Sequence, residues 1–490
     1  MTLRLDLVVW AEAPDVPITS LAYSSRDVAP GALFFCVPGF TADGHDFAPE
    51  AVARGAAALV CERPLGLGVP EVIVPAVRAA MGPAAARFHG DPTRELHVVG
   101  ITGTNGKTTT AYLVRALLEA AGVPCGLLGT VTSVIGGREE PVERTTPEAV
   151  DLQRSFRRMV DAGDRACALE VSSHALELGR ADGIRFACRV FTNLSQDHLD
   201  FHPSMEHYFL AKRRLFEVAG DDPDTSVVNV DDEWGRRLAA DLDGVVTYAI
   251  ERPADLRARD VRFGPDGSSF RVETPDGSAV VSTRLPGHFN VLNALAALGA
   301  ARALGVELEL AARALAEAGR VPGRMEPVEE GQEFAVLVDY AHTPEALENV
   351  LPAARELCRG RLHVVFGAGG DRDKTKRPLM GRVARALADR VVVTSDNPRS
   401  EDPEAIVDEV LLGTGEDVEH DVDRRRAIAR ALAGAEAGDV VVIAGKGHEQ
   451  GQEFADGRKE PFDDVTVARE MLRGAKAATG PDRAATARRR

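Results

Sequence analysis

A glycine-rich turn at residues 103–109 constrains the fold of this chain more strongly than any other segment. It follows an apolar run at residues 97–102 and precedes an amphipathic pattern that closes near Gly122. The run predicts a buried strand, and the pattern predicts a helix. The turn itself reads Gly103-Thr104-Asn105-Gly106-Lys107-Thr108-Thr109. A strand, a glycine turn and a helix in this order are typical of phosphate-binding loops in open α/β sheets.

The residue types of this turn fit a phosphate cradle. Glycines let backbone N–H groups converge on phosphate oxygens, Lys107 adds a cation, and the Thr108 hydroxyl can reach Mg²⁺. The strict consensus has glycine where this chain has Ile101, so the loop is a variant of the ordinary one. A structural glycine turn is the alternative, and nucleotide binding alone does not identify a reaction.

Short apolar runs on both sides of the loop predict three α/β domains. Runs at residues 166–171 and 186–191 alternate with helical patterns, which favours a mainly parallel sheet covered by helices. A second alternating series after residue 321 predicts a Rossmann-like domain. The expected divisions are a small N-terminal domain (residues 1–90), a central nucleotide-binding domain (91–321), a C-terminal Rossmann-like domain (322–476) and a disordered tail (477–490).

Two helix starts can be predicted from capping chemistry. Thr146-Pro147-Glu148 combines a capping residue, a proline and an acidic first turn, so we expect a helix with Thr146 as its N-cap. Thr343-Pro344-Glu345 predicts a second capped helix directly after a strand.

The composition excludes several classes of function. The formal net charge of −17 repels nucleic acid. No segment approaches the ~18 uncharged apolar residues of a membrane span, and Asp6 interrupts any signal-peptide core. The 6 cysteines lie far apart, which indicates neither a disulfide framework nor a zinc site. We therefore expect a cytoplasmic protein with neither nucleic-acid partners nor membrane insertion.

The variant loop is the first of several motifs that resemble the Mur ligase family. The others are Leu169-Glu170-Val171-Ser172-Ser173-His174, Asn193-Leu194-Ser195-Gln196-Asp197-His198-Leu199-Asp200, and Met205-Glu206-His207-Tyr208 followed by Lys212. Their spacing is similar to that of the UDP-N-acetylmuramoyl-tripeptide synthetases within this family. The resemblance covers nearly the entire chain.

The resemblance implies a magnesium and phosphate site. Taken singly, Glu170 would be a solvated acid, His198 a packed histidine and Lys212 a surface cation. By resemblance, Lys107, Glu170, His198 and Lys212 are catalytic. Mg²⁺ is expected on Thr108, Glu170 and His198. CO₂ is expected to carbamylate Lys212, which turns this cation into an anion near the metal.

The residues implied to bind ATP come from three parts of the chain. They are Gly103, Thr104, Asn105, Gly106, Lys107, Thr108, Thr109, Asn290, Asn293, Arg324, Asp339 and His342. An asparagine helix cap is the alternative for the stretch around Asn290.

A UDP-linked muramoyl dipeptide is the second ligand that the resemblance implies. Its expected contacts are Tyr23, Ser25, Phe40, Thr41, Ala42, Thr145, Thr146, Ser172, Leu178 and Arg180. A glycine-rich surface turn is the alternative for the N-terminal part of this set. The chain has Ser24, Arg144 and Leu178 where relatives often have Asp, Asn and Gln, respectively.

Two arginines, each after a predicted strand, indicate how an amino acid is selected. Arg372 follows Gly369-Gly370-Asp371, and Arg399 ends the tetrapeptide Asp396-Asn397-Pro398-Arg399. A guanidinium binds a carboxylate with two parallel hydrogen bonds, and diaminopimelate differs from lysine by one carboxylate. The residues implied to bind diaminopimelate are Arg372, Asp396, Asn397, Pro398, Arg399, Gly445 and Glu449. Ordinary surface ion pairs are the alternative.

The implied function is ATP-dependent ligation of meso-diaminopimelate to UDP-N-acetylmuramoyl-L-alanyl-D-glutamate through an acyl phosphate, in peptidoglycan synthesis. ATP, Mg²⁺ and a carbamate on Lys212 are the expected co-substrate and cofactors, and a monomer is expected. Three alternatives stay open: folylpolyglutamate synthesis, a P-loop kinase or NTPase, and a non-catalytic UDP-sugar-binding regulator. The presence of Lys107, Glu170, His198 and Lys212 argues against the regulator.

Overall fold

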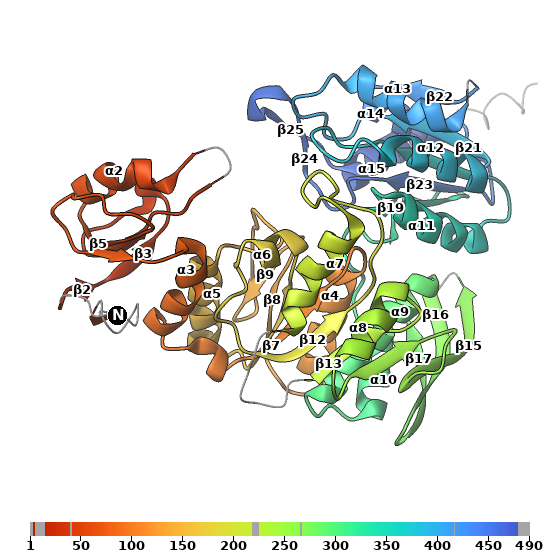
Figure 1. The fold of residues 1–490 in the computed structure, drawn as a ribbon. Helices are drawn as coiled ribbons and strands as arrows, with labels where there is room; N and C mark the ends of the chain where they lie inside the picture. Colours follow the sequence, from red (N-terminus) through yellow and green to blue (C-terminus); the bar gives the residue numbers. More distant parts are fainter. Residues whose placement is uncertain are drawn as a thin grey trace, which may run out of the picture.

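The protein folds into three α/β domains, each built around its own main sheet (Figure 1). The structure is a computed structural model that describes residues 3–4, 15–39, 42–217, 225–264, 267–415 and 417–478. Within these ranges, no helix combines the length and apolar character needed to cross a bilayer. The predicted three-domain α/β fold is confirmed.

The N-terminal domain contains a parallel sheet in the order β3-β4-β5-β6. Its helix α3 packs against α5 of the central domain, and the Tyr23 hydroxyl donates to Asp151 Oδ2 at 2.6 Å. The elements are β1 Leu3–Arg4, β2 Pro17–Ile18, β3 Ser20–Ala22, η1 Ser25–Asp27, β4 Ala32–Phe35, η2 Gly44–Phe47, α2 Ala48–Ala53, β5 Ala56–Cys61, β6 Glu71–Ile73 and α3 Val77–Phe88.

The central domain is organised by one sheet of 11 strands, in the order β10-β9-β8-β11-β7-β12-β13-β14-β15-β16-β17. The strands from β8 to β15 are parallel, while β9, β10, β16 and β17 add antiparallel edges. The strands are β7 His97–Thr102, β8 Cys125–Leu128, β9 Ser133–Ile135, β10 Arg138–Glu140, β11 Ala166–Glu170, β12 Phe186–Phe191, β13 Thr225–Asn229, β14 Val246–Ala249, β15 Leu256–Gly264, β16 Gly267–Thr274 and β17 Gly277–Thr283. The sequence did not predict the antiparallel meander β15–β17.

Helices cover both faces of this sheet, as the alternating pattern predicts. One core includes Leu113, Leu298 and Leu315 from α4, α9 and α10. The other includes Phe156 and Phe209 from α5 and α7. The helices are η3 Pro92–Arg94, α4 Lys107–Ala120, α5 Ala149–Ala162, α6 Ser173–Glu177, α7 Met205–Arg213, η4 Arg214–Phe216, α8 Glu233–Asp241, α9 His288–Ala303 and α10 Leu308–Glu317.

The predicted start of helix α5 is wrong by two residues. Its N-cap is Glu148, and the hydroxyl of Thr146 instead donates to the Glu170 carbonyl at 2.8 Å. The Thr146 hydroxyl therefore bonds to the end of strand β11 and does not provide the cap of helix α5 that the local pattern predicted. By contrast, Thr343 caps α11 as predicted, accepting from the Ala346 N–H.

The C-terminal domain has a sheet in the order β18-β19-β23-β20-β21-β22, parallel except for β18. Its elements are β18 Glu326–Pro327, β19 Ala335–Asp339, α11 Pro344–Leu357, β20 Leu362–Phe366, α12 Lys376–Leu387, β21 Arg390–Thr394, α13 Pro403–Thr414, β22 Glu419–Asp421, α14 Arg424–Ala433, β23 Val440–Ala444, β24 Gly451–Glu453, η5 Ala455–Gly457, β25 Lys459–Pro461 and α15 Asp464–Ala478. Helix α15 ends at Ala478, two residues inside the predicted disordered tail. The other residues of this tail, 479–490, lie outside the described ranges.

Candidate active site

The glycine-rich turn joins β7 to α4 as a tight loop. Gly103 and Gly106 have φ of 154° and 86°, which glycine adopts far more readily than other residues. A side chain on Gly106 would collide with Asn293, and one on Gly103 would collide with Thr192. The loop is thus packed closely between β12 and α9, with Gly106 as the N-cap of α4.

Two lysine amines, of which Lys212 is fully buried and Lys107 partly exposed, share one acceptor at the loop. The amines of Lys107 and Lys212 each donate to the Gly103 carbonyl at 2.8 Å, and Lys107 also donates to the Thr104 carbonyl at 2.9 Å. Burial, followed by the charge of Lys107, lowers the pKa of Lys212 well below its ordinary value. Burial lowers the pKa of Lys107 as well. The surface cation that local sequence predicts at position 212 is a buried amine with 1% exposure.

Glu170 ends β11 beside the loop and is 1% exposed. It accepts hydrogen bonds from the Thr108 hydroxyl at 3.0 Å and from the N–H and hydroxyl of Thr130 at 2.8 and 2.9 Å. Arg324 reaches the same Thr108 hydroxyl with Nη2 at 3.1 Å. Glu170 is therefore a held carboxylate at the carboxyl end of a parallel strand, where open α/β sheets bind ligands.

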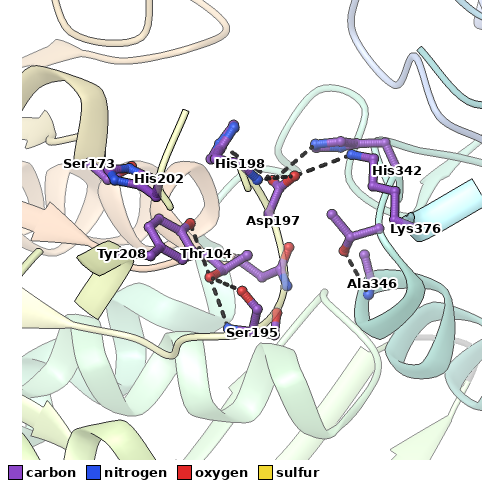
Figure 2. Close-up of polar contacts among 12 residues, drawn as sticks. Thr104, Ser173, Ser195, Asp197, His198, His202, Tyr208, His342, Ala346 and Lys376 are labelled. Carbon is purple, nitrogen blue, oxygen red and sulfur yellow. Dashed lines mark hydrogen bonds and ion pairs between the residues drawn. The ribbon is translucent and has the colours of Figure 1, made fainter. Parts of the chain in front are cut away.

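Asp197 lies close to three cationic or titratable groups, one of which is its neighbour His198 (Figure 2). It lies 3.2 Å from Lys376 Nζ, 3.4 Å from His198 Nε2 and 3.8 Å from His342 Nε2. Burial would raise the pKa of Asp197, but the charge of Lys376 outweighs it and holds this pKa below its usual range. Burial lowers the pKa of His198 to about 3, so its imidazole is neutral at pH 7.

The donor set for a metal ion is incomplete by itself. Glu170 and His198 supply one carboxylate oxygen donor and one neutral imidazole. In the part of the chain that the structure describes, no three His, Cys, Asp or Glu side chains cluster as a metal site. Mg²⁺ takes few protein ligands and completes its shell with water and substrate phosphates, so these residues fit a phosphate-bound ion.

The C-terminal domain contacts the phosphate loop through α11 and the start of α12. Glu345 accepts from the amide of Asn105 at 2.7 Å and from the hydroxyl of Ser195. The Gln196 amide donates to Asp373 at 3.2 Å and to Thr375 at 2.9 Å. Both domains therefore build the site.

A cavity of about 900 Å³ is lined from both domains. The predicted residues that line it are Thr104, Asn105, Gly106, Lys107, Thr108, Thr109, Thr145, Thr146, Glu170, Ser172, Leu178, Arg180, His198, Asn293, Arg324, Asp339, His342 and Arg372. Gly103, in the loop, and Lys212, which donates to its carbonyl, do not line the cavity. Asn290 lies beneath Asn293, whose amide donates to it at 3.1 Å. Gly287 is the N-cap of α9, so the alternative of an asparagine cap is wrong.

Three guanidinium groups converge on Glu148 at the edge of this cavity. Arg180, Arg144 and Arg78 lie 3.0, 3.2 and 3.4 Å from its carboxylate. Burial lowers the pKa of Arg180 from its usual value. Arg78 comes from α3, so the N-terminal domain reaches the central domain here. The cluster gives this end of the cavity a concentration of positive charge.

The predicted uridine contacts lie apart from the cavity lining. Tyr23 is bonded to Asp151, the buried Ser25 donates to Glu50 at 3.0 Å, and Ala42 is exposed. Ser24 caps η1 by accepting from the Arg26 N–H. Phe40 and Thr41 lie outside the described residues. The serine and tyrosine hydroxyls thus already have internal partners.

The predicted amino-acid residues form a cluster around a buried cation, Lys446. Its amine donates to Asn397 Oδ1 at 2.9 Å and to Glu449 Oε2 at 3.0 Å, and it lies 3.9 Å from Asp396. The Asn397 amide also donates to Glu449 at 2.8 Å. A side chain on Gly445 would press against Asp396 Oδ2 at 2.5 Å. Strands β21 and β23 bring together the loops that follow them, at residues 396–397 and 445–449, although these loops lie far apart in sequence.

Arg399 follows Pro398 at the rim of this cluster. Its Nη1 donates to the Gly370 carbonyl at 2.8 Å, and its Nε lies 3.2 Å from Glu453. Arg399 does not line the cavity, whereas Arg372 does.

Sequence reasoning missed five residues that hold this site together: Thr130, Asp197, Glu345, Lys376 and Lys446. Asp197 and Glu345 stand inside motifs already singled out, and Lys446 follows the predicted Gly445, so proximity to these residues was an available signal. Lys376 pairs with Asp197 across 179 positions, and a local pattern carries no trace of such a contact.

Comparisons with known proteins agree along the chain. Family models match residues 101–301 as a Mur ligase middle domain, 323–447 as a Mur ligase glutamate ligase domain and 17–89 as a Mur ligase family catalytic domain. A UDP-N-acetylmuramoyl-L-alanyl-D-glutamate--2,6-diaminopimelate ligase of Geobacillus kaustophilus is 49% identical over 467 residues, covering 93% of this chain and 95% of its own. The same-named protein of Gloeobacter violaceus is 49% identical over 465 residues, covering 94% of each.

A solved structure of a protein with this name superimposes with a TM-score of 0.69 at 34% identity. The match covers 97% of this chain and 99% of the other. Sequence and fold therefore agree over almost the whole length, and the chain belongs to the Mur ligase family.

Proposed function

We propose that this protein uses ATP to ligate meso-2,6-diaminopimelate to the D-glutamate of UDP-N-acetylmuramoyl-L-alanyl-D-glutamate, in peptidoglycan synthesis. The observation that carries the proposal is the shared cavity, which Lys107 and Glu170 line from the central domain and Arg372 lines from the C-terminal domain. It brings phosphate chemistry and carboxylate recognition together. The diaminopimelate ligases that resemble the chain support this pair of substrates.

The reaction has two steps. The γ-phosphoryl group moves from ATP to the glutamate carboxylate, giving an acyl phosphate and ADP. The diaminopimelate amine then attacks the acyl carbon, loses a proton and expels phosphate, which leaves an amide. The loop N–H groups and Lys107 stabilise the charge that develops on the transferred group, so positioning and electrostatics supply the catalysis.

Thr108, Glu170 and His198 are the residues proposed to hold Mg²⁺. When bound, the ion neutralises charge on the phosphate oxygens. Thr130 orients the Glu170 carboxylate with two hydrogen bonds, and the neutral His198 ring offers a lone pair.

The buried Lys212 is proposed to carry a carbamate. A neutral amine can attack CO₂, forming an N–C bond and releasing a proton. Burial beside Lys107 favours that neutral form. The product is an anion, which would offset the positive charge of Lys107 in the loop.

The remaining candidates are proposed to bind the two ends of the acceptor and the amino acid. Thr145, Thr146, Ser172, Leu178 and Arg180 are assigned to the muramoyl dipeptide. Tyr23, Ser25, Phe40, Thr41 and Ala42 are assigned to the uridine end. Asp396, Asn397, Pro398, Arg399, Gly445 and Glu449 join Arg372 around diaminopimelate. We also propose a cytoplasmic monomer with domain boundaries near residues 90 and 321.

Coupled phosphate release and mass spectrometry test the proposal. Phosphate release is expected only when the UDP-linked dipeptide and diaminopimelate are both present, with a product heavier by one diaminopimelate less water. ATP turnover that needs neither substrate would instead support an NTPase. Glutamate addition to a folate would support the folylpolyglutamate alternative.

A further inference from the structure

Two loops of the C-terminal domain carry the candidate arginines and meet at Gly369. A methyl group on Gly369 would lie 3.0 Å from Arg399 Nη1 and 3.8 Å from Arg372 Cγ. The Gly370 N–H donates to the Asn397 carbonyl at 2.8 Å. The Gly370 carbonyl accepts from Arg399 Nη1. The loops at residues 369–374 and 396–401 are therefore bonded to each other beside both arginines.

Each loop holds one non-glycine residue in the left-handed region of backbone conformation. Asp371 has φ of 53°, and Arg399 has φ of 52°. Side chains disfavour this region, so the surrounding bonds must hold the backbone in place. The position of Arg399 therefore depends on contacts beyond its own guanidinium.

Three side chains supply these bonds across the two loops, and we call Asp371, Arg377 and Glu401 the clasp. Asp371 accepts from the N–H and hydroxyl of Ser400 at 3.2 and 2.6 Å. Glu401 accepts from the Asp371 N–H at 2.6 Å. Each loop thus donates a backbone N–H to an acid of the other loop.

Arg377 connects the other parts of the clasp through hydrogen bonds. Its side chain is fully buried, and its two Nη atoms donate to Glu401 at 3.0 and 2.8 Å. It also donates to the Gly369 carbonyl at 3.1 Å and to Glu409 at 2.8 Å. The paired guanidinium lowers the pKa of Glu401 to about 2, so the clasp is fully charged at neutral pH.

We propose that the clasp sets the spacing of Arg372 and Arg399 and thereby selects an amino acid with a second carboxylate. The inference rests on the proposed ligase function and deepens it. Asp371, Arg377 and Glu401 are positioning residues, because they act through the two arginines. Bidentate binding of a carboxylate is sensitive to the placement of the guanidinium, so a loosened clasp should weaken selection more than chemistry.

The test compares Glu401→Gln with Glu404→Gln, which removes the same charge from an exposed carboxylate in the first turn of α13. Steady-state rates are measured with diaminopimelate, with lysine and with varied ATP. Glu401→Gln is expected to raise KM for diaminopimelate about tenfold and to lower the preference for diaminopimelate over lysine by the same factor. Its kcat and its KM for ATP should stay within about twofold, as should every constant of Glu404→Gln.

An unchanged preference in Glu401→Gln would overturn the role of the clasp. If that variant folds poorly, Asp371→Asn applies the same criterion at an exposed residue whose loss affects the contacts with Ser400. A wild-type protein that forms no amide with either amino acid would instead overturn the proposed function. The two failures are therefore distinguishable.

Discussion

The phosphate loop and the amino-acid cluster both hold amine or guanidinium groups with little exposure, but these groups have different partners. Lys107 and Lys212 donate to backbone carbonyl groups, and within the described residues neither forms an ion pair. In the C-terminal domain, Arg377, Arg424 and Lys446 are fully buried, and each contacts at least one carboxylate. One region holds uncompensated amines, and the other holds a finished network.

This difference shows what each region awaits. An uncompensated buried amine is unfavourable until an anion arrives, so the loop is prepared for phosphate and for a change of charge at Lys212. In the C-terminal network each buried cation already has a carboxylate partner. A ligand therefore adds little stabilisation there, and the network serves to hold its side chains in fixed positions. The predictions below test this contrast, from the largest expected effect to the smallest.

Lys212→Ala is expected to lower turnover by at least about 10³-fold, because an anion near the transferred phosphate is lost. Short carboxylates added to the assay should restore part of the activity. Arg213→Ala, at the neighbouring surface position, is the control and should keep its activity. Phosphate release measures both, and full activity in Lys212→Ala would refute the carbamate.

Removal of a buried cation should have opposite effects on stability in the two regions. Arg424→Leu leaves the fully buried Asp464 without its partner, so a loss of about 3–5 kcal/mol in unfolding free energy is expected. Lys212→Leu strands no carboxylate and should leave the melting temperature equal or higher. Thermal unfolding of both variants provides the measurement. A large fall in the melting temperature of Lys212→Leu would contradict the proposed difference between the two regions.

Arg399→Ala is expected to reduce kcat/KM for diaminopimelate about 10²-fold while ATP affinity stays unchanged. Glu453, the ion-pair partner of Arg399, is partly exposed, so loss of the arginine leaves no buried carboxylate without a partner. Competition between diaminopimelate and lysine, read by product mass, provides the measurement. A variant that still prefers diaminopimelate to the same degree would defeat this assignment.

The smallest effect is a pH dependence of stability. The pKa of Glu401 is about 2 in the fold against an ordinary 4.5, so its ionised form stabilises the fold above pH 4.5. That contribution is lost as the pH falls toward 2. The difference in melting temperature between wild type and Glu401→Gln should therefore be larger at pH 7 than at pH 3. An equal difference at both pH values would contradict it.

The sequence predicted the strands of this molecule well because their apolar runs are local. Runs at residues 97–102 and 186–191 coincide with β7 and β12. The predicted start of α5 was wrong because the Thr146 hydroxyl bonds to the Glu170 carbonyl of β11, 24 positions away. The meander β15–β17 was missed although Pro-Asp-Gly stands at residues 265–267 and 275–277, a turn signal that the sequence reasoning did not use.

The sequence predicted several residues of the candidate site, but it did not predict the contacts between them. Family motifs and glycine chemistry named Lys107, Glu170 and His198, and the structure brings them to one cavity. The burial of Lys212 and its shared acceptor depend on the packing of α7 against β7, which no local pattern encodes. The contact of Asp197 with Lys376 depends on how two whole domains meet.

The hydrogen bonds of Glu345 have a consequence for the speed of this protein. Its carboxylate holds Asn105 of the phosphate loop and Ser195 at the same time, and burial raises its pKa. On the proposed function, nucleotide binds the loop that these bonds hold, so we expect its departure to require α11 to move away. Release of ADP would then be tied to the separation of two domains, and that step would limit the number of cycles per second.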